Sequence, residues 1–140
     1  MSKALLRAHF EQIWNQQDAS GIERFIAPDY RGFDAEALIS GIAGYKEHFV
    51  TLTTAFPDLR LTIEVLLEGD GRAAARSVAE ATHRGPFGEI PPTGKRVRVT
   101  GEAIIRVENR QIVEEHANSD ALGLLTQLGV LPGTVKVPPA

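Results

Sequence analysis

The segment "LRLTIEVLL" (residues 59–67) alternates between apolar and polar side chains over most of its length. Alternation is the pattern of a β-strand, because successive side chains of a strand point to opposite faces of the sheet. The pattern therefore predicts a strand with one buried and one exposed face. The expected buried face holds Leu59, Leu61, Ile63, Val65 and Leu67.

The residues that follow extend this strand into a sheet. "GDG" (69–71) is typical of a tight turn, and a second strand is predicted from Arg72 to His83. The segment 84–95 holds three Gly and three Pro, so it is expected to be a loop. A third strand is predicted over 96–107 and a fourth, "IVEEHANS", over 112–119. Together these make four long strands in an antiparallel meander.

The residues before the sheet show helical periodicity. A first helix is predicted over Ser2–Asn15. A second starts at Ser20, where "SGIE" has the spacing of a capping box, and Pro28 closes it. A third follows Gly41 and cannot continue through Pro57.

Helices ahead of an antiparallel sheet indicate an α+β fold with helices covering one sheet face. We expect a cone-shaped, strongly curved antiparallel sheet of four long strands and a short one, "YRGF" (30–33). Three N-terminal helices cover it, and "ALGLLTQLG" (121–129) forms a short C-terminal helix. The expected domain is 1–131, with 132–140 as a tail.

Composition excludes several classes of function. The formal charge of −3 argues against a nucleic-acid partner, which requires a basic surface. No apolar run is long enough to cross a membrane. The chain has no cysteine, so it forms no disulfide and no cysteine-based zinc site. A cytoplasmic location is the simplest expectation.

The segment "VEEHANSD" (113–120) carries the most informative polar pattern. Glu114, His116, Asn118 and Asp120 occupy every second position, so a regular strand places them on one face. That face is either the polar outside of the sheet or the wall of a pocket, and we expect it to line the mouth of the cone. Alternate strand positions splay apart rather than converge on one ion, so no metal site is predicted.

Two longer segments resemble a known family: "THRGPFGEIPPTGKRVRVTG" (82–101) and "ENRQIVEEHANSDALGLLTQLG" (108–129). The chain resembles the SnoaL-like polyketide cyclases of the nuclear transport factor two-like superfamily over about residues 5–130. The resemblance implies an α+β cone, a homodimer, and cyclisation of a hydrophobic, polyketide-like carbonyl compound without a cofactor. It departs from many relatives at Gly32 and Phe33, where they carry a histidine nearby, and at His116, where an aromatic residue is frequent.

In that family an aspartate at the end of the last strand is the general acid/base of an intramolecular aldol closure, and Asp120 matches it. A carboxylate can remove a C–H proton and return one to the new alkoxide if burial raises its pKa. The alternative is structural, because Asp is a preferred N-cap and a helix follows at once. The catalytic role needs burial that raises the pKa of Asp120, whereas the N–H groups at a helix start would lower it.

The other candidates also have two interpretations each. His116 would donate to a substrate carbonyl, or pair with Glu114 or Glu102. Asn118 would orient a carbonyl or make a structural hydrogen bond. Glu102 would supply a second carboxylate in the pocket or pair with a cation on the outer face. His83 would lie at the pocket rim or anchor the following loop.

Aromatic residues at helical spacing are usually core, but in a cone the same side chains also line the cavity. Trp14, Phe33 and Phe49 would then form the wall for a flat, hydrophobic ligand. Three functions remain open: an acid/base cyclase or isomerase, a small-molecule binding protein without catalysis, and a hydrolase that activates a water.

Overall fold

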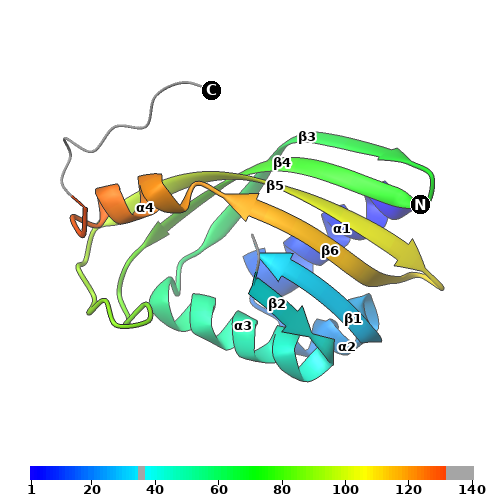
Figure 1. Cartoon of the computed structure of the whole chain (residues 1–140), viewed down its shortest axis with the longest axis horizontal. Coiled ribbons are helices and arrows are strands. Elements are labelled where there is room, and N and C mark those ends of the chain that lie inside the picture. The colour runs from blue at the N-terminus through cyan, green and yellow to red at the C-terminus, as the bar shows by residue number, and fades with distance from the viewer. Residues whose placement is uncertain (35–36, 132–140) are drawn as a thin grey trace.

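Six strands form one curved sheet in the order β2–β1–β6–β5–β4–β3. The computed structural model (Figure 1) describes residues 1–34 and 37–131 of the chain. The tail predicted over 132–140 lies outside the described residues. The helices are α1 (Ser2–His9), α2 (Ile22–Phe25), α3 (Gly41–Ala55) and α4 (Ala121–Gln127). The strands are β1 (Ile26–Asp34), β2 (Ala37–Ser40), β3 (Arg60–Gly69), β4 (Arg72–Thr82), β5 (Arg96–Glu108) and β6 (Gln111–Ser119).

The α+β prediction and the meander β3–β4–β5–β6 are confirmed, but the sheet is mixed rather than antiparallel. β1 pairs in parallel with β6, and β2 adds an antiparallel edge to β1. The predicted short strand at 30–33 is part of a longer strand whose register shifts between Ile26 and Arg31. Pro28 lies in that irregular stretch, where it has no N–H to give to a neighbouring strand.

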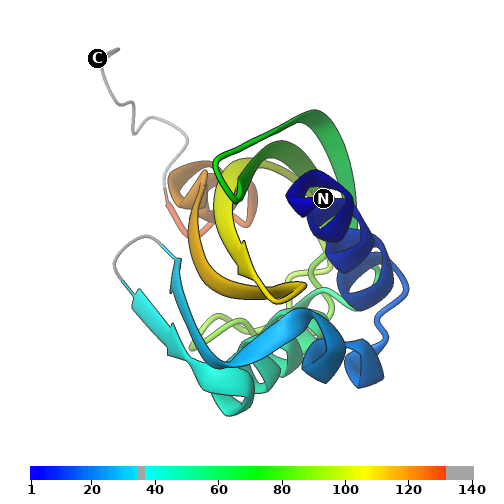
Figure 2. The same cartoon turned by 90° about the vertical axis from the view of Figure 1, so that its right-hand side faces the viewer.

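The helices cover the concave face of the sheet. α1 packs on β3, β4 and β5, while α3 packs on β1 and β2. Viewed end-on in Figure 2, the sheet curls around this side with α1 and α3 beside it. The apolar core between them includes Leu6, Ile13, Ile26, Tyr45, Ile105 and Ile112.

The first predicted helix is continuous, but its second half is wound differently. After α1, the segment Phe10–Asn15 forms a π-helical turn, closed by Gln16 N–H donating to the Glu11 carbonyl at 2.9 Å. The capping box predicted at Ser20 is wrong. Asp18 instead caps a 3₁₀ turn over Ala19–Gly21, because its carboxylate accepts the Ser20 N–H.

The alternation predicted for β3 is interrupted. The pairing of β3 with β4 shifts register between Ile63 and Val65. A bulge of this kind moves all later residues to the other face. Val65 and Leu67 are therefore 46% and 63% exposed, whereas Leu66 packs against the core.

The loop 84–95 has no regular structure, as predicted, apart from a bridge between Phe87 and Ile90. Its start is fixed to the end of α3, because the N–H groups of Arg84 and Gly85 both donate to the Ala55 carbonyl. Within the described residues, we find no helix with the length and apolar character needed to span a membrane.

Gly85→Ala is expected to destabilise the fold. A Cβ at position 85 would lie 2.1 Å from the Thr54 carbonyl oxygen, so the loop or the end of α3 must move. Overpacking of this kind costs about 1–3 kcal/mol. Urea unfolding measures the loss. Gly69→Ala is the control, since its Cβ meets nothing within 4 Å. Equal stability of the two variants would contradict the packing described here.

Candidate active site

A cavity of about 190 Å³ lies between the concave face of the sheet and the helices. Aromatic side chains form much of its wall and carboxyl groups lie among them. The lining includes Phe10, Trp14, Tyr30, Phe33, Asp34, Tyr45, His48, Glu102, Glu115 and Asn118. We call it the inner cavity.

Glu115 is the carboxyl group that β6 places in the inner cavity. Its Oε1 accepts a hydrogen bond of 2.8 Å from the Tyr30 hydroxyl on the neighbouring β1. Gly32 makes this contact possible, because a Cβ there would lie 2.2 Å from the Tyr30 hydroxyl oxygen. The glycine at this point of the chain therefore leaves the space that the Tyr30 side chain occupies.

Burial raises the pKa of the Glu115 carboxyl above its ordinary value of 4.5. The hydrogen bond from Tyr30 opposes this by stabilising the carboxylate, and the negative charge of Asp34 raises the pKa further. The pKa of Tyr30 is raised as well, first by burial and then by the charge of Glu115. Tyr30 therefore stays protonated and remains a donor. The pair is suited to exchanging a proton at the carboxyl group.

A second buried hydroxyl lies beside this pair. The rings of Tyr45 and Tyr30 meet edge-on, with their centroids 5.4 Å apart. Trp14 Nε1 donates to the Tyr45 hydroxyl at 3.0 Å, and His9 Nε2 lies 2.5 Å from the same oxygen. Burial raises the pKa of Tyr45 well above its ordinary value.

His48 of α3 lies edge-on to Trp14, with ring centroids 5.9 Å apart, and also lines the inner cavity. Burial lowers its pKa below 6.5, although the nearby charge of Asp34 acts in the opposite direction. Its imidazole is therefore mostly neutral near pH 7, when one nitrogen can donate and the other can accept.

An apolar recess of about 200 Å³ adjoins the inner cavity toward α4. The two share four lining residues, Trp14, Leu52, Leu61 and Ser119. The remaining lining of the recess is apolar: Phe56, Leu59, Ala79, Ala81, Val97, Val99 and Leu124. A molecule with a polar and an apolar end could occupy both spaces.

Asn118 is in the lining of the inner cavity as expected, whereas His116 and Asp120 are not in it. From β6, the inner cavity is lined by the alternate residues Glu115, Ala117 and Ser119, together with Asn118. His116 is exposed on the outer face, where its ring stacks on Phe33 at 4.8 Å. Its Nε2 lies 3.2 Å from Glu114 Oε1, so the alternative of pairing with Glu114 is confirmed.

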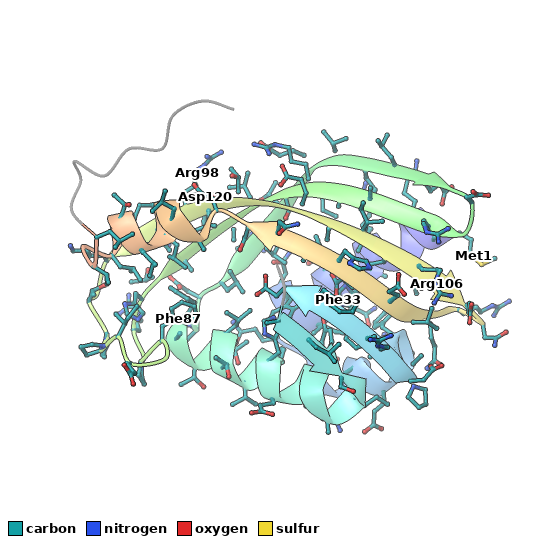
Figure 3. The ribbon with its side chains drawn as sticks, in the orientation of Figure 1. Met1, Phe33, Phe87, Arg98, Arg106 and Asp120 are labelled. Carbon is teal, nitrogen blue, oxygen red and sulfur yellow. The ribbon has the colours of Figure 1, made fainter. Side chains whose placement is uncertain are left out.

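Asp120 lies where β6 meets α4 (Figure 3), and its side chain is exposed. Its Oδ1 accepts the Gly123 N–H at 2.9 Å. The capping alternative is therefore confirmed. A catalytic role for Asp120 stays a prediction.

Glu102 and Asn118 are opposite each other on β5 and β6, and both contribute to the rim of the inner cavity. Both residues are exposed. The Glu102 carboxylate accepts a hydrogen bond of 2.6 Å from Arg76, which also pairs with Glu64 at 3.2 Å. The alternative of a cation partner for Glu102 is thus confirmed. Glu115 and Asp34 are the other carboxyl residues that line the cavity.

The predicted aromatic wall is present in part. Trp14 lines the inner cavity, and Phe33 contributes to its rim while its ring stacks on His116. Phe49 is buried behind Trp14, with ring centroids 5.4 Å apart. His83 is fully buried and outside both linings. Its Nδ1 accepts the Thr93 N–H at 3.2 Å, which fits the predicted alternative of anchoring the loop.

Glu115, Tyr30 and Tyr45 were not among the predicted site residues. One signal for Glu115 was available: Val113 and Ala117 share its phase on the strand and are apolar, which marks that face as the inner one. Across the described residues, no three His, Asp or Glu side chains are grouped so that they could hold a metal ion.

Comparisons with known proteins show the family and the fold of the chain. The family model of the SnoaL-like polyketide cyclases matches residues 4–128. No protein with a curated description matches the chain. Among solved structures, AclR from Streptomyces galilaeus, described as a proposed hydroxylase, is 30% identical with a TM-score of 0.82, covering 93% of this chain and 97% of its own.

Two further structures are similar. IdmH from Streptomyces antibioticus, described as a proposed polyketide cyclase, is 27% identical with a TM-score of 0.77, covering 92% of this chain and 99% of its own. A SnoaL-like protein from Jannaschia is 21% identical with a TM-score of 0.84, covering 92% of each chain, and supports the fold alone.

Removing the hydrogen bond from Tyr30 is expected to raise the pKa of Glu115 further, because that bond stabilises the carboxylate. Tyr30→Phe deletes the donor, and Gly32→Ala displaces it through the 2.2 Å clash. Carboxyl-carbon NMR titration measures the pKa of Glu115 in both variants. Gly69→Ala, which meets nothing within 4 Å, should leave the titration unchanged. An unchanged or lower pKa in Tyr30→Phe would contradict the assigned role of the hydrogen bond.

Proposed function

Because the chain belongs to the SnoaL-like polyketide cyclase family, we propose that it catalyses an acid/base cyclisation or isomerisation of a hydrophobic carbonyl compound in the inner cavity. The observation that supports this most is the Glu115 carboxyl. It lies in an aromatic cavity, its pKa is raised by burial, and the Tyr30 hydroxyl holds it in position.

The chemistry follows from these groups. An aldol closure begins when a base removes a proton from a carbon flanked by two carbonyl groups. The electrons of the C–H bond move to a carbonyl oxygen, the enolate carbon attacks a second carbonyl, and the new alkoxide takes up a proton. Glu115 takes the first proton as a carboxylate and returns it as a carboxylic acid, so the group ends the cycle as it began. A carbon acidified by two carbonyls needs no metal or organic cofactor for this step.

Asp120 is the candidate that the family resemblance implies. Its exposed carboxylate accepts the Gly123 N–H at the start of α4. A residue in that position would act on a substrate held at the junction of β6 and α4. The Glu115 carboxyl lies among the cavity walls that would hold a hydrophobic substrate, so we assign the acid/base role to Glu115 and keep Asp120 as the competing assignment. In either case His116 lies outside the cavity.

The proposal can be tested without the natural substrate. Ethyl benzoylacetate, an aryl β-keto ester, has a C–H bond between two carbonyls, and its exchange with deuterium in heavy water reports enolisation by NMR. Glu115→Gln should lower the protein-catalysed exchange rate about 10²–10⁴-fold, the usual contribution of a general base. The wild-type rate should rise with pH through a pKa above 4.5, because the carboxylate is the active form.

Glu114→Gln is the matched control. Glu114 is the preceding residue of β6 and points to the outer face, where it pairs with Arg106 and His116. The Glu114→Gln variant should catalyse the exchange of the ester at the wild-type rate. If Asp120→Asn loses the exchange and Glu115→Gln retains it, the acid/base role belongs to Asp120. If the wild-type protein binds the ester but does not catalyse its exchange, the result favours a binding protein without catalysis. Uptake of labelled oxygen from water would favour a hydrolase, and uptake from O2 a hydroxylase.

We also propose that a second copy of the chain covers the outer face of the sheet. One row of facing residues crosses all six strands: Leu67, Ala74, Ile104, His116, Phe33 and Leu38. Leu67, Ile104 and Leu38 are 63%, 50% and 53% exposed. The pairs Arg76–Glu102 and Arg106–Glu108 flank the row with both signs of charge, as a two-fold contact between identical surfaces requires.

Leu67→Glu should convert the dimer to a monomer, because it places a charge in the apolar row. Sedimentation velocity measures the change in mass. Val50→Glu on α3 is the control, since Val50 is 59% exposed and lies away from the row. A monomeric wild-type protein, or a Leu67→Glu variant that stays dimeric, would contradict this assignment.

A further inference from the structure

The Tyr45 hydroxyl lies between two ring nitrogens at the wall of the inner cavity. Trp14 Nε1 is 3.0 Å from the Tyr45 oxygen and His9 Nε2 is 2.5 Å from it. An indole N–H can only donate, so the oxygen accepts from Trp14. The direction of the contact with His9 depends on which nitrogen of the imidazole carries the hydrogen.

The surroundings of His9 favour one tautomer. His9 is fully buried, and burial lowers its pKa to about 3, so the ring is neutral near pH 7. Its Nδ1 is buried and has no hydrogen-bond partner among the described residues. If Nδ1 carried the hydrogen, a buried N–H would be unpaired. An unpaired donor is rarer in proteins than an acceptor that lacks a partner. We therefore place the hydrogen on Nε2.

In this tautomer both nitrogens donate to Tyr45, so its oxygen accepts two hydrogen bonds and its own O–H hydrogen is not committed to either ring. We propose that Tyr45 donates this hydrogen bond to the oxygen of the enolate formed in the inner cavity, and that His9 is the positioning residue that frees it. This inference rests on the proposed function, in which Glu115 removes the C–H proton while negative charge develops on that oxygen.

The winding of the first helix supplies independent support. His9 and Trp14 are five residues apart, which in an α-helix of 3.6 residues per turn places them about 140° apart around the axis. The π-helical turn Phe10–Asn15 follows His9 and includes Trp14, and it is closed by a bond between residues five apart, from Gln16 N–H to the Glu11 carbonyl. Wider winding brings residues at this spacing toward the same face. π-helical turns are rare in proteins, and those that occur are often found at functional sites. Here His9 Nε2 and Trp14 Nε1 both lie against the Tyr45 hydroxyl oxygen.

The tautomer can be measured directly in the wild-type protein. Long-range ¹H–¹⁵N correlation of the imidazole rings distinguishes a protonated nitrogen from a bare one, and His9→Gln assigns the signals. We expect hydrogen on Nε2 and a bare Nδ1 at pH 7. Hydrogen on Nδ1 would overturn the inference, because Tyr45 would then donate to His9 and have no hydrogen for a ligand. This measurement requires no variant other than the one used for assignment.

The functional consequence is tested with the same deuterium exchange of ethyl benzoylacetate. Tyr45→Phe should lower kcat about 10²–10³-fold, as loss of one donor to a developing oxyanion does, with little change in KM. His9→Leu removes the N–H donor and should lower kcat in the same direction. His9→Gln keeps an N–H that can reach Tyr45 and should recover part of the rate, which a merely structural role for His9 would not predict.

The two proposals fail separately. Full exchange in Glu115→Gln would contradict the assignment of the acid/base role to Glu115, whatever Tyr45 does. Loss of exchange in Glu115→Gln together with a wild-type kcat in Tyr45→Phe would leave that assignment standing and overturn the role of Tyr45. Thermal melting of each variant identifies those that do not fold. For a His9 variant that does not fold, the wild-type tautomer decides the role of His9.

Discussion

The hydrogen bond from Tyr30 to Glu115 is the interaction on which the rest of the site depends. It joins β1 to β6 across the parallel pair and fixes a carboxyl group among aromatic rings. A carboxylate without a partner is costly in such surroundings, so burial raises the pKa of Glu115 while the Tyr30 hydroxyl limits the rise. The two opposing effects leave a group that can both accept and release a proton.

This arrangement requires particular backbone geometry. The Tyr30 hydroxyl occupies the space that a side chain at Gly32 would take, and β1 must run alongside β6 for the two residues to meet. The helices complete the cavity from the other side, with Trp14 on the π-helical turn and Tyr45 on α3. The adjoining apolar recess then offers room for the hydrophobic part of a substrate. The family suggests a hydrophobic, polyketide-like ligand, and these walls are consistent with that.

Local periodicity was enough to predict most elements. Alternation located β3 to β6, and turn residues located their connections, because these features depend on neighbours in sequence. The parallel pairing of β1 depends on contacts far along the chain and was missed. The bulge between Ile63 and Val65 reversed the faces of Val65 and Leu67. A second register shift, between Arg106 and Val107, left both Ile112 and Val113 buried, so Val113 and Ala117 marked the inner phase of β6 only weakly.

Of the residues predicted on β6, Asn118 lines the inner cavity and His116 is exposed outside it, and their roles stay predictions. "EEHANS" carries polar residues in both phases, and within it Ala117 is the one apolar residue that marked the phase of Glu115. Asp120 fitted both a helix cap and a catalytic group, and the structure shows the cap. Tyr30, Tyr45 and His9 were not predicted, because their polar atoms are brought together inside the core only by the folded chain.

A crystal structure with 2-naphthol tests the central claim most directly, because this flat phenol carries an oxygen that resembles an enolate oxygen. The account predicts that the ring lies in the inner cavity, with its oxygen within hydrogen-bond distance of Tyr45 or Glu115. Binding beside Asp120 at the start of α4, or on the outer face against His116 and Ile104, would contradict it.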